Sequence, residues 1–246
     1  VFNNAGTVNQ QATGTHAIGG GIAFNNSGTV NVQAGTLRVD GGGTDTGAYD
    51  VAGDATLRFN GGTRNLNAGT TVSGAGTMWV SGGTVKANIA LDLEGSGTGL
   101  AISGGTFTVN QTLIAGSLAM TGGALAGTVV VTVRGAFSVT GASVRLSGSG
   151  TLRTQGTSTL NLSEGNGSVA LDAGWTWINE GTLTIGGDDR LYFGYDSGGT
   201  NTLTNAAGGV INLTTSAGNA LDVYTGTAVF NNAGTVNQQA TGTHAI

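Results

Sequence analysis

The phrase Gly-Thr followed by an apolar, a polar and a further, usually apolar, residue recurs along the chain and constrains the fold more than any other feature. It begins at Gly28 (GTVNV), Gly35 (GTLRV), Gly76 (GTMWV), Gly105 (GTFTV), Gly150 (GTLRT) and Gly181 (GTLTI). Alternation with period two predicts a short strand with one apolar and one polar face. Glycine-containing pairs bound these segments and predict turns. The chain therefore reads as many short strands, without a convincing helical period.

Composition supports a folded chain and excludes several classes of protein. Glycine makes up 48 of 246 residues, but 38% of the residues are hydrophobic and the net charge is only −5, unlike a disordered chain. Cysteine is absent, which excludes disulfides and thiolate metal sites. Eight Lys and Arg against thirteen Asp and Glu make nucleic acid a poor partner. No apolar run is long enough to predict a membrane-spanning segment.

The beginning of the sequence recurs unchanged at its end. Val1–Ile18 reads VFNNAGTVNQQATGTHAI, and Val229–Ile246 reads the same. We therefore expect residues 1–228 to be one full tandem repeat and residues 229–246 to begin the next, identical copy. The expected partners are adjacent copies joined end to end, as one continuous chain or as subunits in head-to-tail contact. The residues expected at the junction are Val1, Phe2, Asn3, Asn4, Ile18, Val229, Phe230, Asn231, Asn232 and Ile246.

A second phrase, rich in asparagine, leads into some of the strands. It appears at Phe2 (FNNAGTV), Phe24 (FNNSGTV), Ile178 (INEGTL), Thr204 (TNAAGGV) and Phe230 (FNNAGTV). Near each end of the chain, neighbouring occurrences lie roughly 22–26 residues apart, a spacing typical of one turn of a solenoid. From about residue 84 to residue 174 the strand rhythm continues without this phrase.

Two architectures accommodate many short strands. An antiparallel sandwich or barrel closes and stops, whereas a parallel β-helix adds turn upon turn without a cap. A repeated block that continues in register favours the second architecture. We therefore predict an all-β, right-handed parallel β-helix (a β-solenoid) with about nine to eleven turns per repeat, an advance of about 45–55 Å. Similar turns would stack asparagines or aliphatic side chains into ladders.

The asparagine phrases and the Gly-Thr strands resemble the repeat regions of large bacterial surface proteins. The family they resemble is that of the filamentous-haemagglutinin-like adhesins, with the related autotransporter passenger domains. The resemblance implies export from a bacterium and an extracellular or cell-surface location. It also implies a β-helical shaft with an adhesive or matrix role. Besides adjacent copies, the further partners considered are neighbouring shafts that associate sideways, or surface glycans.

The leading functional hypothesis is a structural one: a rigid extracellular fibre or stalk that acts as a spacer, is not an enzyme and needs no cofactor. Its stability would grow with the number of stacked turns. The first alternative is an adhesin module whose side recognises glycans. The second alternative is an enzyme of the polysaccharide-cleaving β-helix class.

Four aromatic residues are the candidate glycan contacts. Trp175 and Trp177 lie two positions apart and share one face of a strand. Directed outward, they would form a strip on which sugars stack, together with Tyr192 and Tyr195 on the next turn. Directed inward, the two indoles would fill a wide section of the core, which is the more usual place for large aromatic side chains.

Two groups of carboxylates invite a chemical interpretation. Gly187-Asp188-Asp189-Arg190 would suit acid–base work on a glycosidic bond, or it is a solvated turn in which Arg190 neutralises an aspartate. Asp40, Asp45, Asp50 and Asp54 offer oxygen ligands for calcium, but without the strict Gly-Gly-x-Gly-x-Asp pattern. A loop that protrudes from the coil is the simpler interpretation of that stretch. We therefore assign no catalytic, cofactor or metal-binding residue from the sequence.

Overall fold

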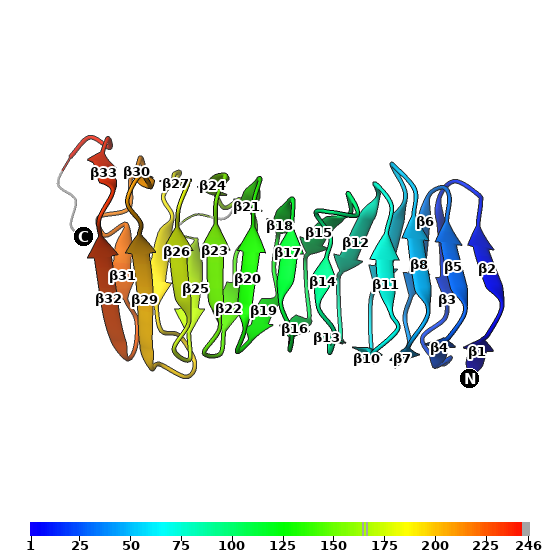
Figure 1. Ribbon diagram of the computed structural model, residues 1–246. Coiled ribbons are helices and arrows are strands. Elements are labelled where there is room, and N and C mark those ends of the chain that lie inside the picture. Colours follow the sequence, from blue (N-terminus) through cyan, green and yellow to red (C-terminus); the bar gives the residue numbers. More distant parts are fainter. Residues whose placement is uncertain (164, 166, 243–246) are drawn as a thin grey trace. The chain divides into compact units, whose positions relative to one another are not determined.

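The computed structural model describes residues 1–163, 165 and 167–242 (Figure 1). In this part of the chain every regular element is a strand. No helix long and apolar enough to cross a membrane occurs among the described residues. The chain divides into two compact units, Val1–Gly116 and Ser117–Ile246, and each is a stack of parallel strands.

In the first unit, strands stack on three sides of a coil. The first side carries β1 (Phe2–Asn4), β4 (Phe24–Asn26), β7 (Gly43–Asp45), β10 (Thr63–Leu66), β13 (Thr84–Ala87) and β16 (Thr106–Val109). The second carries β2 (Thr7–Gln10), β5 (Thr29–Val32), β8 (Ala48–Val51) and β11 (Thr71–Ser73), and, in a separate sheet, β14 (Leu91–Asp92) and β17 (Leu113–Ala115). The third carries β3 (Thr15–Ile18), β6 (Thr36–Val39), β9 (Thr56–Phe59), β12 (Thr77–Val80) and β15 (Gly99–Ile102).

The second unit repeats this arrangement. One sheet contains β18 (Leu118–Met120), β21 (Phe137–Val139), β24 (Thr157–Leu160), β27 (Thr182–Ile185), β30 (Val210–Leu213) and β33 (Thr235–Gln238). Another contains β19 (Ala124–Gly127), β22 (Val144–Ser147), β25 (Ser168–Asp172), β28 (Arg190–Phe193) and β31 (Leu221–Val223). The last contains β20 (Val130–Val133), β23 (Thr151–Thr154), β26 (Thr176–Asn179), β29 (Thr200–Asn205) and β32 (Thr227–Asn232).

Within each unit a strand pairs in parallel with the strand three places later, so three strands complete one turn. In the first unit β1 pairs with β4, β2 with β5 and β3 with β6. In the second unit β26 pairs with β29 and β27 with β30. The expected all-β fold is confirmed as a parallel β-solenoid of about 11 turns. Its right-handed sense stays a prediction.

The apolar positions of the Gly-Thr phrase point into the coil, as the alternation predicts. All six strands that begin with this phrase alternate between half-buried and buried positions. In Thr29–Val32, for example, Val30 and Val32 are completely buried. Each fully buried aliphatic or aromatic side chain stabilises the fold by about 1.5–3 kcal/mol. The core is therefore a column of inward side chains from the three sides.

Stacked glycines form one corner of the coil in the first unit. Gly62, Gly83 and Gly105 lie directly before the strands β10, β13 and β16, with φ of 64°, 67° and 65°. A β-carbon on Gly105 would collide with the carbonyl group of Gly83, and one on Gly83 with that of Gly62. Only glycine combines this left-handed conformation with so close a backbone approach. The recurring Gly-Gly-Thr therefore marks a corner at which successive turns touch.

Candidate functional site in the repeated segment

The strands of the first copy of the repeated segment pair with neighbours along one edge only. β1, β2 and β3 are terminal strands of their sheets, and they pair with β4, β5 and β6, which follow them in the sequence. Val1 is 82% exposed and Phe2 39% exposed, although Phe2 occupies the same inward register as the fully buried Phe24. Ile18 shares the register of the buried Val39. The apolar side chains at this edge therefore lack a covering turn.

The strands of the second copy pair along the opposite edge, with strands that precede them in the sequence. β32 contains Val229–Asn232 and pairs with β29, which precedes it in the sequence. β33 pairs with β30 in the same manner. Both are again terminal strands of their sheets. The last expected junction residue, Ile246, lies outside the described residues. One amino-acid sequence thus pairs with following turns in one copy and with preceding turns in the other.

The backbone hydrogen bonds of the two copies use different atoms. In the first copy the carbonyl groups of Asn4 and Gly6 accept from the N–H groups of Ser27 and Thr29, at 2.8 Å each. In the second copy the N–H groups of Ala233 and Thr235 donate to the carbonyl groups of Asn205 and Gly209, at 2.9 Å each. Ala233 and Thr235 correspond to Ala5 and Thr7 of the first copy. A segment flanked on both sides could therefore make both sets of bonds at once.

The inward asparagine side chains form hydrogen-bonded ladders with one polarity. Asn4 Nδ2 donates to Asn26 Oδ1 at 2.8 Å. In the second unit Asn179 Nδ2 donates to Asn205 Oδ1 at 2.9 Å, and Asn205 Nδ2 donates to Asn232 Oδ1 at 2.8 Å. Each of these inward amides thus donates to the asparagine of the following turn. Since Asn232 and Asn4 are the same position of the repeat, this residue accepts from behind in one copy and donates forward in the other.

The register of this ladder corrects one expectation from the sequence. The spacing of the asparagine phrase aligned Asn205 with Asn231. The structure pairs Asn205 with Asn232 and sets Asn231 beside Thr204. A shift by one position would turn every side chain of the strand to the opposite face. The inward asparagine is the one directly before the corner. The sequence alone does not distinguish it from the asparagine next to it.

Replacement of Asn205 by alanine should destabilise the second unit by about 1–3 kcal/mol, because buried groups lose their partners. Asn205 is completely buried, and its Nδ2 also donates to the carbonyl groups of Gly209 and Thr235. Thermal unfolding and hydrogen exchange of β29 and β32 measure the loss. Asn237→Ala is the matched control, since Asn237 makes one half-buried ladder bond to Asn212. Equal losses in both variants would show that the inward ladder is not the stabilising feature.

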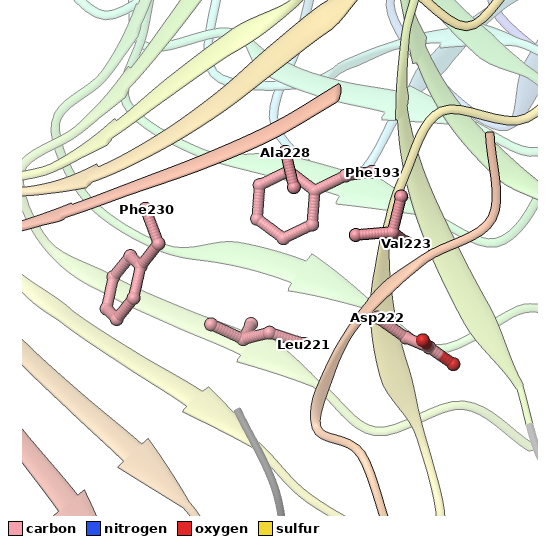
Figure 2. Close-up of a pocket in the computed structure, with 6 residues that line it drawn as sticks. All are labelled: Phe193, Leu221, Asp222, Val223, Ala228 and Phe230. Atoms are coloured by element: carbon pink, nitrogen blue, oxygen red, sulfur yellow. The ribbon is translucent and has the colours of Figure 1, made fainter. Parts of the chain in front are cut away.

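The last turn of the second unit holds an apolar cavity. Figure 2 shows its lining, in which Phe193, Leu221, Val223, Ala228 and Phe230 surround an open space and the carboxylate of Asp222 points away from it. Its volume is about 280 Å³. Val223 is 52% exposed. Ala228 and Phe230 belong to β32, the strand that contains the start of the repeated segment, so the cavity lies where the repeat begins again.

The two tryptophans adopt the inward alternative. Trp175 and Trp177 are both completely buried, so neither indole is accessible to a glycan. Trp177 packs edge-on against Phe137, with ring centroids 5.4 Å apart, and its Nε1 donates to Thr154 Oγ1 at 3.0 Å. The physical reason is the strand alternation, which directs positions 175, 177 and 179 to the interior. These two residues are removed from the candidate glycan surface.

Tyr192 and Tyr195 lie half-buried on the outside and contact a third tyrosine, Tyr224. Tyr195 and Tyr224 stack at 5.0 Å with an interplanar angle of 14°. Tyr192 meets Tyr224 at 5.4 Å and 52°. Sequence reasoning missed Tyr224, because it lies about 30 residues after Tyr192 in the sequence. The two residues meet only because β31 stacks on β28.

The Gly-Asp-Asp-Arg segment is a turn between β27 and β28. Asp189 is completely buried, and its Oδ2 accepts the N–H of Leu162 at 2.6 Å. Burial raises the pKa of Asp189, an effect that the hydrogen bond from Leu162 opposes. Arg190 pairs with Asp222 at 3.6 Å. One oxygen of the buried Asp189 carboxylate is therefore held by the protein's own backbone.

The aspartate-rich stretch is not the protruding loop that the sequence suggested. It contributes β7 and β8 to the coil. Asp45 is completely buried, and Nη1 of Arg64 donates to its Oδ1 and Oδ2 at 2.7 and 2.6 Å. Asp40 pairs with Arg38 at 2.7 Å, and Asp50 and Asp54 are exposed. Among the described residues no group of three or more His, Cys, Asp or Glu gathers in a way that would hold a metal ion.

No family model, curated protein or solved structure matches this chain. The fold and the geometry of the repeated segment therefore carry the functional argument by themselves. What they establish is a parallel β-solenoid, consistent with a β-helical repeat protein.

Proposed function

We propose that this chain is a stretch of a longer tandem array that forms a rigid extracellular spacer on a bacterial surface. The observation that carries the proposal is the repeated segment itself. Its two copies use complementary halves of one set of contacts, backbone and side chain alike. An inner copy would join Asn205 to Asn26 through a single asparagine, with every amide of this inward ladder donating in the same direction.

Exposed apolar groups support stacking beyond both copies. Val1 and Phe2 of the first copy are exposed, and at the second copy Val223 is exposed and Phe230 lines the cavity. In a continued array the turn that follows Val229–Asn232 would cover this cavity. Unpaired strand edges and apolar ends invite association, and an array satisfies them with its own next turn. The proposed role is a mechanical one without catalysis, in which stacked turns extend an object whose stability rises with length.

A protein of two consecutive copies of residues 1–228 should be longer than a single copy by about 45–55 Å, the advance of about nine to eleven stacked turns. It should also unfold at a higher temperature, since the junction turn gains a second neighbour. Electron microscopy and calorimetry measure both quantities. Two particles joined by a flexible hinge, or a melting temperature equal to that of one copy, would refute the array.

A junction variant sharpens this experiment. In the two-copy protein, leucine in place of the junction asparagine, the residue equivalent to Asn4, interrupts the ladder where the copies meet and leaves both outer ends intact. It should remove most of the gain in melting temperature. Leucine in place of the outward residue equivalent to Asn3 is the control, because Asn3 accepts only an exposed bond from Asn25. The bacterial and extracellular setting follows from the resemblance and is tested by locating the protein in its source cell.

A further inference from the structure

Three tyrosines from two turns of the second unit meet on its surface. Tyr192 lies on β28, Tyr195 in the corner that follows it, and Tyr224 directly after β31. Tyr224 contacts both other rings, yet it is 60% exposed. Among the described residues it is the one large exposed aromatic side chain apart from Phe2. A ring that is braced by two others and still faces solvent is preorganised for a ligand.

Two side chains pack against the ring of Tyr195. The guanidinium of Arg145 lies 4.2 Å from its centroid, and Tyr224 stacks on it. Its backbone N–H donates to Asp172 Oδ1 at 2.9 Å, and the N–H of Ser197 donates to the same oxygen at 3.1 Å. Asp172 is buried, so this corner is held from inside the coil. Tyr224 therefore stacks on a ring whose backbone is held in place by hydrogen bonds.

Charged groups of both signs surround the rings. Arg145 pairs with Asp196, and Arg190 pairs with Asp222 while lying 5.8 Å from the ring centroid of Tyr192. Guanidinium groups donate hydrogen bonds and carboxylates accept them. The rim of the three rings can therefore satisfy ligand hydroxyl groups, each of which is both donor and acceptor.

We propose that Tyr192, Tyr195 and Tyr224 form a platform for a neutral hexopyranose unit of a polysaccharide, which stacks on the exposed ring of Tyr224. The apolar face of a sugar ring matches an aromatic face, and its equatorial hydroxyl groups match the charged rim. A protein partner is disfavoured by size, since a stable protein interface buries about 800 Å² on each side. Of the described residues next to Tyr224, only Val223 adds a large exposed apolar group.

Tyr224 directly follows β31, the terminal strand of its sheet, and its neighbour Val223 lines the cavity that the next turn of the proposed array would cover. In an array the platform would therefore be open on the last copy alone. Binding to a polysaccharide should then not strengthen with the number of copies, whereas the array itself is tested by the length of the two-copy protein.

The test uses affinity electrophoresis of the 246-residue chain in gels that contain a soluble β-glucan, a galactan or a mannan. At least one of these polysaccharides should retard the protein. Tyr224→Ala should weaken that binding about tenfold, the order expected for loss of an aromatic stacking partner. Tyr224→Phe should keep binding within about threefold, because the stacking ring remains. Circular dichroism confirms that these exposed substitutions leave the fold intact.

Trp79→Ala is the matched control. Trp79 is half-buried on β12, and the guanidinium of Arg58 lies 4.2 Å from its ring centroid. Its Nε1 donates to Ser103 Oγ at 2.8 Å, so this ring is occupied by its own neighbours, and the variant should bind like the unchanged protein. Retardation by none of the three polysaccharides, or a loss that is equal in Tyr224→Ala and Trp79→Ala, would overturn the platform. Neither result bears on the length of the two-copy protein.

Discussion

Replacement of Arg64 by methionine should destabilise the first unit by about 3–5 kcal/mol, the cost of leaving a buried charge without its partner. Asp45 is completely buried and Arg64 is 1% exposed. Besides the two bonds from Arg64, the carboxylate accepts the hydroxyl of Tyr49 at 2.8 Å. Arg64 Nη2 also donates to the carbonyl of Phe24 at 3.0 Å. Without the guanidinium, the remaining donors are neutral and the charge stays buried.

The loss of unfolding free energy in Arg64→Met, called the deficit below, should depend on pH. Burial raises the pKa of Asp45, and the charge of Arg64 opposes that rise. Removal of Arg64 therefore raises this pKa further, so the folded variant binds a proton more readily than the unfolded chain does. Such a carboxyl contributes stability at low pH and loses it as the pH rises. The deficit should accordingly be largest near pH 7 and shrink toward about pH 4, the ordinary range of an aspartate.

Urea unfolding at several pH values, with hydrogen exchange of β7 and β10, measures this effect. Asp45→Asn combined with Arg64→Met should recover much of the loss, because no buried charge remains. Arg38→Met is the surface control: its ion pair with Asp40 is partly exposed, and its loss should cost less than about 1 kcal/mol. A deficit that does not change with pH would contradict the assignment of the buried charge.

Sequence reasoning succeeds where one local rule decides the outcome. The Gly-Thr strands are all present with their expected inward residues, because alternation in a half-buried strand is a short-range property. The glycine corners follow from backbone conformation, and the stacking of similar phrases predicts the asparagine ladder. The junction residues Asn4 and Asn232 could thus be proposed from the repeat alone, although their bonding polarity could not.

Sequence reasoning fails where the partner lies in another turn. The phrase Gly-Thr-Arg-Asn-Leu at Gly62 places Arg64 where an apolar residue is expected, and Asp45 stands on the preceding turn. This break in the pattern was the available signal for the buried ion pair. The same applies to Tyr224, which reaches Tyr195 only because two turns stack. Another asparagine ladder, Asn67–Asn88–Asn110, forms without the FNN phrase, because single asparagines at corresponding positions of successive turns suffice.

Trp177→Ala should destabilise the second unit by about 3–5 kcal/mol, because it opens a large cavity in a well-packed core. Both indoles are among the largest fully buried side chains of the described residues. In a solenoid each turn contacts only its neighbours, so the damage should concentrate around β26. Hydrogen exchange should show lost protection in β23, β26 and β29, while strands of the first unit stay protected. A uniform loss over both units would contradict local cooperativity.

Phenylalanine variants separate packing from hydrogen bonding in this core. Trp177→Phe removes the donor to Thr154, whose buried hydroxyl then lacks this bond. The lost hydrogen bond should destabilise the fold by about 1–3 kcal/mol, in addition to the cost of the lost side-chain volume. Trp175 Nε1 has no hydrogen-bond partner among the described residues, so Trp175→Phe loses volume alone. Trp177→Phe should therefore be the more destabilising of the two, and Thr154→Val should reduce the difference. Both variants should bind polysaccharide unchanged, because neither indole reaches the surface; a loss of binding would place the sugar site elsewhere than on Tyr224.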